Sequence, residues 1–536
     1  MTSKQGGENS KPGNNAETAV WKPSFNPWLI AVSVMTATVM EVLDTSVANV
    51  ALPHIAGNLS ATTEEATWVL TSYLISNAII LPATGWISSY IGRKRFLIFC
   101  IVVFTIASAL CGAAPNLQVL IVARILQGIG GGALQPIAQA VLLESFPPEK
   151  RGAAMALYGM GVVVAPIVGP TLGGWITDNY SWRWIFYINL PIGILAAFMA
   201  NTFVEDPPYI KNQNPGKIDY TGFGLMALGL AALELTLDLG QQRDWFESPV
   251  IVFTALTSVV SLVSFVIWEL YVEHPIVNLR VFLNRNFAVG TALIASVGVV
   301  LYGSTALLPL FLQTLLGYPA MESGMAVSPR GIGAVVSMLI VGRLIGKLDS
   351  RFLIMFGFSV LAFSTYMFVG LNLEIASSNV AIPMVITGFG MGFVFVPLTT
   401  LTMGTLENEQ ISNASGIYNL MRNTGGSIGI AAMTTFLARG IQTHMPPLAA
   451  HLSDYDTAFQ EMTAQIKISL TASLGPIAAQ QAALGQVYTM MVRQATVLSY
   501  LDCFRILAFL CMIAVPTALL FKRVKKNGKK IEAAAH

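Results

Sequence analysis

Long apolar runs separated by short polar segments occupy almost the whole chain. A helix needs about 20 mostly apolar residues to cross the hydrocarbon core of a bilayer. By that length the pattern predicts about fourteen membrane-spanning helices. They are expected at residues 28–50, 66–88, 96–114, 118–141, 153–176, 184–204, 219–239, 249–270, 287–313, 323–345, 352–370, 379–402, 413–437 and 499–521. The expected fold class is therefore all-α and integral to the membrane.

The spans fall into groups of six, two and six, which predicts two six-helix bundles with an inserted helix pair. A polar tail rich in Gly, Asn and Lys comes first, with no apparent cleavable signal peptide, and is expected to be disordered and cytoplasmic. The predicted regions are the tail 1–24, the N-terminal bundle 25–204, the linker and inserted pair 205–283, the C-terminal bundle 284–522 and a basic tail 523–536.

Basic residues between the spans indicate the orientation, because short cytoplasmic loops are enriched in Lys and Arg. With the N-terminus inside, the inside segments hold Arg93, Lys94, Arg95, Lys150, Arg151, Lys211, Lys217, Arg280, Arg285, Lys347, Arg351 and the C-terminal lysines and arginine. The outside segments hold fewer, such as Arg183, Arg243, Arg439, Lys467 and Arg493. Both termini are therefore expected in the cytoplasm, as an even number of spans requires.

The segment 438–498 is an external loop of about sixty residues, low in Gly and Pro. Its stretches 455–470 and 476–496 are rich in Ala and Gln, with apolar residues at helical spacing. They predict two amphipathic helices outside the membrane. These helices either receive a partner or form a packed lid that has none.

Composition narrows the class of protein. Of 536 residues, 54% are hydrophobic and 11% charged, whereas soluble domains are about a quarter charged. The net charge of +2 gives no reason to expect nucleic acid, and the four cysteines and five histidines show no metal-ligand spacing. We expect no metal and no cofactor. A Walker-type loop for ATP is absent from the sequence, as is the His or Asp cluster of a membrane enzyme, so an enzyme is not expected.

Several motifs resemble one family. They are Leu43-Asp44-Thr45-Ser46-Val47-Ala48-Asn49-Val50-Ala51-Leu52-Pro53, Arg124-Ile125-Leu126-Gln127-Gly128, Ala165-Pro166-Ile167-Val168-Gly169-Pro170-Thr171-Leu172-Gly173-Gly174, the stretch from Trp182 to Pro191, and Ser323-Gly324 with Pro329-Arg330-Gly331. In this order they resemble the major facilitator superfamily, in its fourteen-helix drug:proton antiporter branch (EmrB- and QacA-like, closer to EmrB). The loop after the second span departs from the pattern, since Ser89 and Tyr90 replace an acidic and a basic residue.

The resemblance implies a multi-pass transporter of the bacterial inner membrane that exports hydrophobic or amphipathic compounds by alternating access, driven by protons. It also implies partners: small hydrophobic substrates, membrane lipid, a periplasmic adaptor (membrane-fusion) protein and an outer-membrane channel. The run Val492-Arg493-Gln494-Ala495 is closer to the branch that uses an adaptor. The alternative is a dedicated proton-coupled exporter of one metabolite, such as a siderophore or fatty acid, that acts alone.

Charged residues inside spans are expected to face a cavity or a partner, because an uncompensated charge in hydrocarbon costs several kcal/mol, about 3 or more. Asp44 and Arg124 fall at similar depth in helices that line the central cavity of the resembling family. Arg124 favours the ionised form of Asp44 while the two are close, and their separation or substrate arrival allows protonation. The alternative is a static ion pair.

Glu41 lies one helical turn before Asp44 on about the same face. Two carboxylates at this spacing repel when both are ionised, so one of them is favoured to hold a proton. Glu41 is therefore a second candidate for the proton carrier, or an attractant for cationic substrates, with a structural role as the alternative.

Weaker candidates for the substrate cavity are Tyr73, Gln127, Glu234 and Arg422, where packing is the alternative. Glu234 belongs to the inserted pair, which the resemblance places outside the transport core. Pro166, Gly169, Pro170, Gly173 and Gly174 are expected to break and thin the fifth span. Small residues let membrane helices approach closely, so these five are predicted to act in hinge motion or packing.

Overall fold

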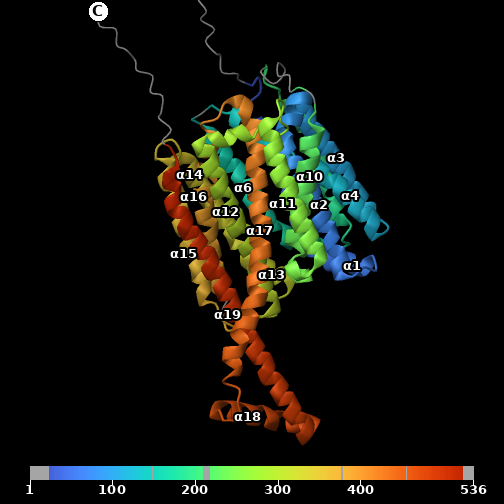
Figure 1. The fold of residues 1–536 in the computed structure, drawn as a ribbon, viewed down its shortest axis with the longest axis vertical. Helices are drawn as coiled ribbons and strands as arrows, with labels where there is room; N and C mark the ends of the chain where they lie inside the picture. The colour runs from blue at the N-terminus through green and yellow to red at the C-terminus, as the bar shows by residue number, and fades with distance from the viewer. Residues whose placement is uncertain are drawn as a thin grey trace, which may run out of the picture.

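The computed structural model describes residues 23–522, apart from 148, 209–215, 217, 376–377 and 454. Over these residues the chain is helical, with no β-strand. Most helices run side by side in one bundle, as Figure 1 shows. The predicted all-α membrane fold is confirmed.

The first six crossings are built from eight helices. Their bounds are α1 (Pro27–Asn58), α2 (Thr63–Ile91), α3 (Arg93–Ala113), α4 (Leu117–Gly131), α5 (Leu134–Ser145), α6 (Arg151–Asn179), α7 (Trp184–Tyr187) and α8 (Asn189–Phe203). Helices α4 and α5 together make one crossing, as do α7 and α8. The inserted pair is α10 (Tyr220–Leu239) and α11 (Pro249–Tyr271).

The second half is similar in plan. Its helices are α12 (Arg285–Thr314), α13 (Ala320–Val327), α14 (Pro329–Leu344), α15 (Ser350–Met367), α16 (Ser378–Met403), α17 (Asn408–Ala449), α18 (Thr457–Leu474) and α19 (Pro476–Thr517). Helices α13 and α14 make one crossing. Short 3-10 turns lie at Gln241–Arg243, Trp245–Glu247, Leu279–Leu283, Phe368–Gly370 and Ala518–Leu520.

Thirteen helices of the described chain are long and apolar enough to cross a membrane. Helix α17 also runs along the bundle and corresponds to the remaining predicted span, 413–437. Helix α17 is not among the thirteen because polar residues such as Asn419 and Arg422 lower its hydropathy. Near its start, Asn413 donates to the carbonyl of Asn278 in the connection between α11 and α12, and its far end leaves the opposite side of the bundle (Figure 1). The fourteen predicted spans therefore all have a counterpart.

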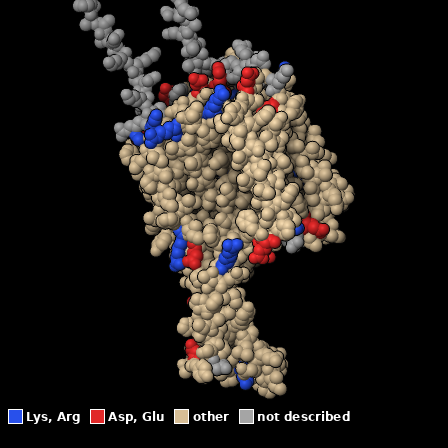
Figure 2. Space-filling model, in the orientation of Figure 1, with Lys and Arg blue, Asp and Glu red and all other residues tan. Residues whose placement is uncertain are grey.

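Both ends of the described chain lie at one end of the bundle, here called the termini end. There the backbone N–H of Ser24 donates to Glu205, and Arg285 donates to the carbonyl of Leu520 at 2.7 Å. Figure 2 shows charged side chains gathered in two bands, with an uncharged belt between them that suits contact with lipid. Lys211, Lys217 and the basic residues after Lys522 lie outside the described residues.

Beyond the opposite end, α18 and parts of α17 and α19 project from the bundle (Figure 1). We call this end the projecting end and these helices, residues 438–498, the projecting hairpin. A helix over 455–470 was predicted, and α18 occupies that region. The second predicted helix, 476–496, is not separate: it is the first part of α19, which continues into the last crossing over 42 residues. No proline interrupts α19 between Pro476 and Pro516, so the helix has no local reason to stop.

The two halves meet closely at the termini end, along α2 and α17. A Cβ on Gly85 would lie 2.6 Å from Asn413 Cα, so only glycine allows this approach. The hydroxyls of Ser88 and Ser412 are 2.9 Å apart across the same contact. This contact between the halves is therefore made by small and neutral polar residues, Gly85, Ser88 and Ser412.

One basic residue of that loop has a role the sequence did not suggest. Arg93 is buried and forms an ion pair with Glu144 at the end of α5, and Asp206 accepts from the backbone N–H of Lys94 at 2.8 Å. Arg93 therefore contributes to the packing of the termini end in addition to the local excess of positive charge.

Candidate functional site

Helix α1 carries two carboxylates into the middle of the bundle. Glu41 and Asp44 lie about 14 and 17 residues after its start, or roughly 21 and 26 Å along the axis. Both side chains are buried. Because this burial keeps both carboxylates from water, their charge must be compensated inside the protein.

The carboxylate charge of Asp44 is compensated by three side chains. Its Oδ2 accepts from Arg124 Nη1 at 2.6 Å, and its Oδ1 accepts from Gln127 Nε2 at 2.9 Å and from Asn189 Nδ2 at 2.6 Å. Three helices, α4, α8 and α1, meet at this carboxylate. The structure thus brings together three of the residues singled out in the sequence, Asp44, Arg124 and Gln127.

Arg124 is held from several sides. Its Nε donates to the carbonyl of Val69 at 3.0 Å and its Nη1 also to Gln127 Oε1 at 2.7 Å. The guanidinium carbon lies 4.3 Å from the centre of the Tyr73 ring, within the range of a cation–π contact. These contacts place the positive charge between Asp44 and the phenol that leads to Glu41.

Glu41 differs from Asp44 because no Lys or Arg of the described chain forms an ion pair with it. Its Oε1 accepts from Tyr73 Oη at 2.9 Å and from Asn77 Nδ2 at 3.3 Å. Its Oε2 accepts from Gln135 Nε2 at 2.8 Å. A buried carboxylate with only neutral donors can hold a proton at lower cost than one that is salt-bridged.

A polar path crosses from this carboxylate to the other half of the protein. Gln135 of α5 donates to Glu41 and accepts from Arg422 Nη2 of α17 at 2.6 Å. Beside it, Asn419 of α17 donates to Gln139 Oε1 at 2.8 Å. We call Glu41, Tyr73, Gln135 and Arg422 the inter-half network. It joins the two halves near the middle of the membrane.

Sequence reasoning missed Asn189, Gln135, Gln139 and Asn419. Asn189 lies in a motif quoted only for its resemblance to a family, and its bond to Asp44 spans 145 residues of chain. Gln135 and Gln139 stand four residues apart in an otherwise apolar run, so they share a helix face. Two amides on one face of a membrane helix are a signal that could have been read as a polar contact with another helix.

The helix with the Pro and Gly motif, α6, is continuous, so the expected break is absent. Pro170 has no N–H for the carbonyl of Pro166, and Ser46 Oγ donates to that carbonyl instead at 2.9 Å. Cβ atoms on Gly169 and Gly173 would lie 2.5 and 2.9 Å from side-chain carbons of Ser46 and Val47. These glycines therefore let α6 approach α1.

Gly174 was grouped with these residues, but it does not share their surroundings. A Cβ at this position would meet no atom within 4 Å. The close helix contact made by Gly169 and Gly173 is therefore not shared by Gly174, and a role for Gly174 in hinge motion or packing stays a prediction.

Glu234 is placed apart from the inter-half network. It is buried in α10 and accepts from Ser427 Oγ of α17 at 2.9 Å. One turn further, Asp238 is hydrogen-bonded to Thr71 of α2. Helix α10 thus packs against a helix of each half, α2 and α17.

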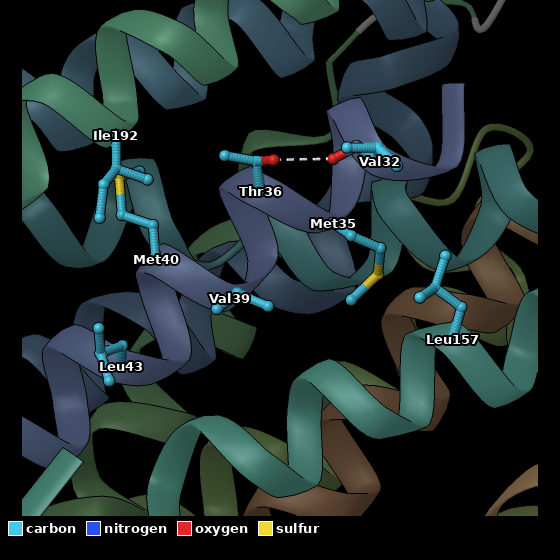
Figure 3. A pocket seen from close by; sticks show the side chains of 8 residues that line it. All are labelled: Val32, Met35, Thr36, Val39, Met40, Leu43, Leu157 and Ile192. Carbon is cyan, nitrogen blue, oxygen red and sulfur yellow. Dashed lines mark hydrogen bonds between the residues drawn. The ribbon is translucent and has the colours of Figure 1, made fainter. Parts of the chain in front are cut away.

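An apolar pocket of about 340 Å³ lies on another face of α1, between α1, α6 and α8 (Figure 3). Its lining residues are Val32, Met35, Thr36, Val39, Met40, Leu43, Leu157 and Ile192. The one polar group, the Thr36 hydroxyl, donates to the carbonyl of Val32 at 2.8 Å. The four predicted cavity residues Tyr73, Gln127, Glu234 and Arg422 do not line this pocket.

Two helical halves joined by a buried polar network across the membrane define a polytopic membrane transporter. The chain belongs to the Major Facilitator Superfamily, whose family model matches residues 34–430. The family resemblance expected from the motifs is confirmed.

Its relatives include transporters from several bacteria. The chain is 41% identical to the fatty acid resistance protein FarB of Neisseria gonorrhoeae, over 82% of this chain and 86% of the relative. It is 38% identical to the multidrug export protein EmrB of Haemophilus influenzae over the same shares, and 36% identical to that of Escherichia coli K12 over 89% and 91%. The chain is thus a multi-pass membrane protein related to bacterial export and resistance proteins.

A solved structure shares the fold. The human organic anion transporter MFSD10 (TETRAN) superposes with a TM-score of 0.57 at 11% identity, over 91% of this chain and all of that chain. At this identity the likeness concerns the fold alone.

Proposed function

We propose that this protein exports hydrophobic and amphipathic compounds from a bacterial cell across the inner membrane by alternating access, in exchange for protons. Both termini are then cytoplasmic, with the termini end inside and the projecting hairpin outside. The excess of basic residues between the spans on the termini side supports this orientation.

The observation that carries the proposal is the different compensation of the two buried carboxylates. Asp44 forms an ion pair with Arg124, whereas Glu41 is held by neutral donors and reaches Arg422 only through Gln135. When the halves separate along their interface, Arg422 moves away from Gln135, and the surroundings of Glu41 change. A carboxylate whose surroundings differ between two states takes up a proton in one state and releases it in the other.

Purified protein in liposomes with an imposed pH gradient tests this function. A lipophilic cationic dye should accumulate against its own gradient when the pH gradient is present, and this accumulation should collapse when a protonophore is added. An unchanged dye distribution with and without the gradient, for several dyes of different shape, would count against proton-coupled multidrug export.

We further propose that the projecting hairpin receives a periplasmic adaptor protein, which connects to an outer-membrane channel. Large apolar side chains on this hairpin face water: Tyr455 is 97% exposed, Ile477 80% and Ile468 75%. Where the hairpin meets the bundle, a pocket of about 530 Å³ is lined by residues such as Phe459 and Met491. Exposed apolar side chains in an aqueous compartment indicate a contact with another protein.

A variant lacking residues 445–495 should lose binding of the adaptor, measured by co-purification with the adaptor encoded in the same organism. A milder variant, Ile468→Ser with Ile477→Ser, leaves both long helices in place and should weaken binding at least tenfold, because two anchoring side chains are lost. Dye transport in liposomes serves as the control for folding. Undiminished adaptor binding by both variants would contradict the proposed contact.

The second candidate function is a dedicated exporter of one metabolite, such as a fatty acid or siderophore. A relative at 41% identity is a fatty acid resistance protein, which favours this alternative over other narrow functions. The same liposomes distinguish the two: a dedicated exporter moves one class of compound and none of the cationic dyes.

A further inference from the structure

Arg330 is a buried cation in the second half that the proposed proton path does not use. It lies at the start of α14, about nine residues or roughly 14 Å from the projecting end of its crossing. Its side chain is 3% exposed. Its one hydrogen bond among the described residues runs from Nη1 to the hydroxyl of the partly buried Thr305 on α12, at 2.8 Å.

The other edge of this guanidinium is free. Neither Nε nor Nη2 of Arg330 has a hydrogen-bond partner within the described structure, and no acidic side chain there forms an ion pair with it. Arg124 and Arg422 each leave only one nitrogen without a partner. Nε and Nη2 lie on the same edge of the planar group, and this edge binds the two oxygens of a carboxylate side by side.

A free guanidinium edge at this depth is costly, because an uncompensated charge in the membrane costs several kcal/mol, about 3 or more. The cost falls when an anion binds. Lipid phosphates do not reach this site, since Arg330 lies roughly 14 Å from the membrane surface. The anion must therefore enter the bundle, and it needs an apolar part to be stable there.

The position of Arg330 connects it to the transport core. The next residue, Gly331, faces Ile167 of α6: a Cβ at position 331 would lie 3.6 Å from the Ile167 side chain. On α12, Thr305 lies one helical turn after Tyr302, and the Tyr302 ring contacts Gly426 of α17. Gly426 in turn lies one helical turn after Arg422. Arg330 thus lies beside the seam between the halves, on the projecting side of the inter-half network.

We propose that Arg330 and Thr305 form a binding site for the carboxylate of amphipathic substrates, with the apolar tail along the seam between α6 and α13–α14. This inference rests on the proposed export function and names one substrate class for it. The same transporter would then accept lipophilic cations through other contacts, and carboxylates through Arg330.

The test compares dodecanoate with its methyl ester, which has the same tail without the charge. Binding to the purified full-length protein is measured by displacement of a lipophilic fluorescent probe at pH 8.5. Wild type should bind the acid about tenfold more tightly than the ester, as expected for a charge-assisted bidentate contact. Arg330→Gln should bind acid and ester equally, at the affinity of the ester, and Arg330→Lys should keep part of the preference.

Arg330→Gln should bind the uncharged methyl ester within twofold of wild type, and this retained binding controls for folding. The proposal is overturned if wild type binds acid and ester equally, a comparison that needs no variant. It is also overturned if Arg330→Gln keeps the preference for the acid, or weakens binding of acid and ester alike. If the export proposal fails instead, the wild-type protein would still bind these ligands but would not transport the dye when the pH gradient is imposed.

Discussion

Replacing Arg124 with leucine should be the most damaging single change in this protein. It leaves Asp44 as an unpaired carboxylate that is 2% exposed, and loss of one partner of a buried ion pair costs about 3–5 kcal/mol. We expect a marked fall in the thermal unfolding temperature in detergent and no gradient-driven dye transport. Differential scanning fluorimetry and the liposome assay measure the two effects.

The double variant Arg124→Leu with Asp44→Asn separates a structural ion pair from a proton site. Removing both charges also removes the uncompensated one, so most of the lost stability should return, while transport should remain absent. If transport returned together with stability, the pair would be structural and Asp44 would have no part in proton coupling.

Glu41→Gln should abolish proton coupling with little effect on stability. An amide has nearly the same shape. Its oxygen can accept from Gln135 Nε2, which leaves the Gln135 oxygen free to keep its bond from Arg422, and its NH2 can donate to Tyr73 Oη. Gradient-driven dye accumulation should fall at least tenfold. Dye-for-dye exchange without a gradient should persist, because that process needs no proton.

Glu234→Gln is the matched control, since Glu234 is also a buried carboxylate with a neutral donor, Ser427, but lies outside the inter-half network. It should keep both gradient-driven accumulation and exchange. Equal loss of coupling in both variants would mean that buried charge in general, and not Glu41 in particular, is needed. Full coupling in Glu41→Gln would move the proton role to Asp44.

Local sequence was sufficient to predict the membrane-spanning helices, because whether a segment crosses the membrane depends on the length of its apolar run. The sequence also predicted that α17 crosses the membrane, because the apolar run 413–437 is long enough even though the polar residues of α17 lower its mean hydropathy. It failed at the projecting hairpin, where 476–496 joins the last crossing in one helix. An amphipathic stretch next to an apolar one contains no signal for where a helix must end.

The sequence alone determined that this chain crosses the membrane about fourteen times, that it belongs to the Major Facilitator Superfamily, and that Asp44, Glu41 and Arg124 are unusual charges within its spans. Only the tertiary structure decided which groups compensate them. The Asp44–Asn189 bond joins residues 145 apart in the chain, and the Gln135–Arg422 bond joins residues 287 apart. The physical reason is that a span is a property of neighbouring residues, whereas the state of a buried charge depends on the few donors that packing brings within about 3 Å of it.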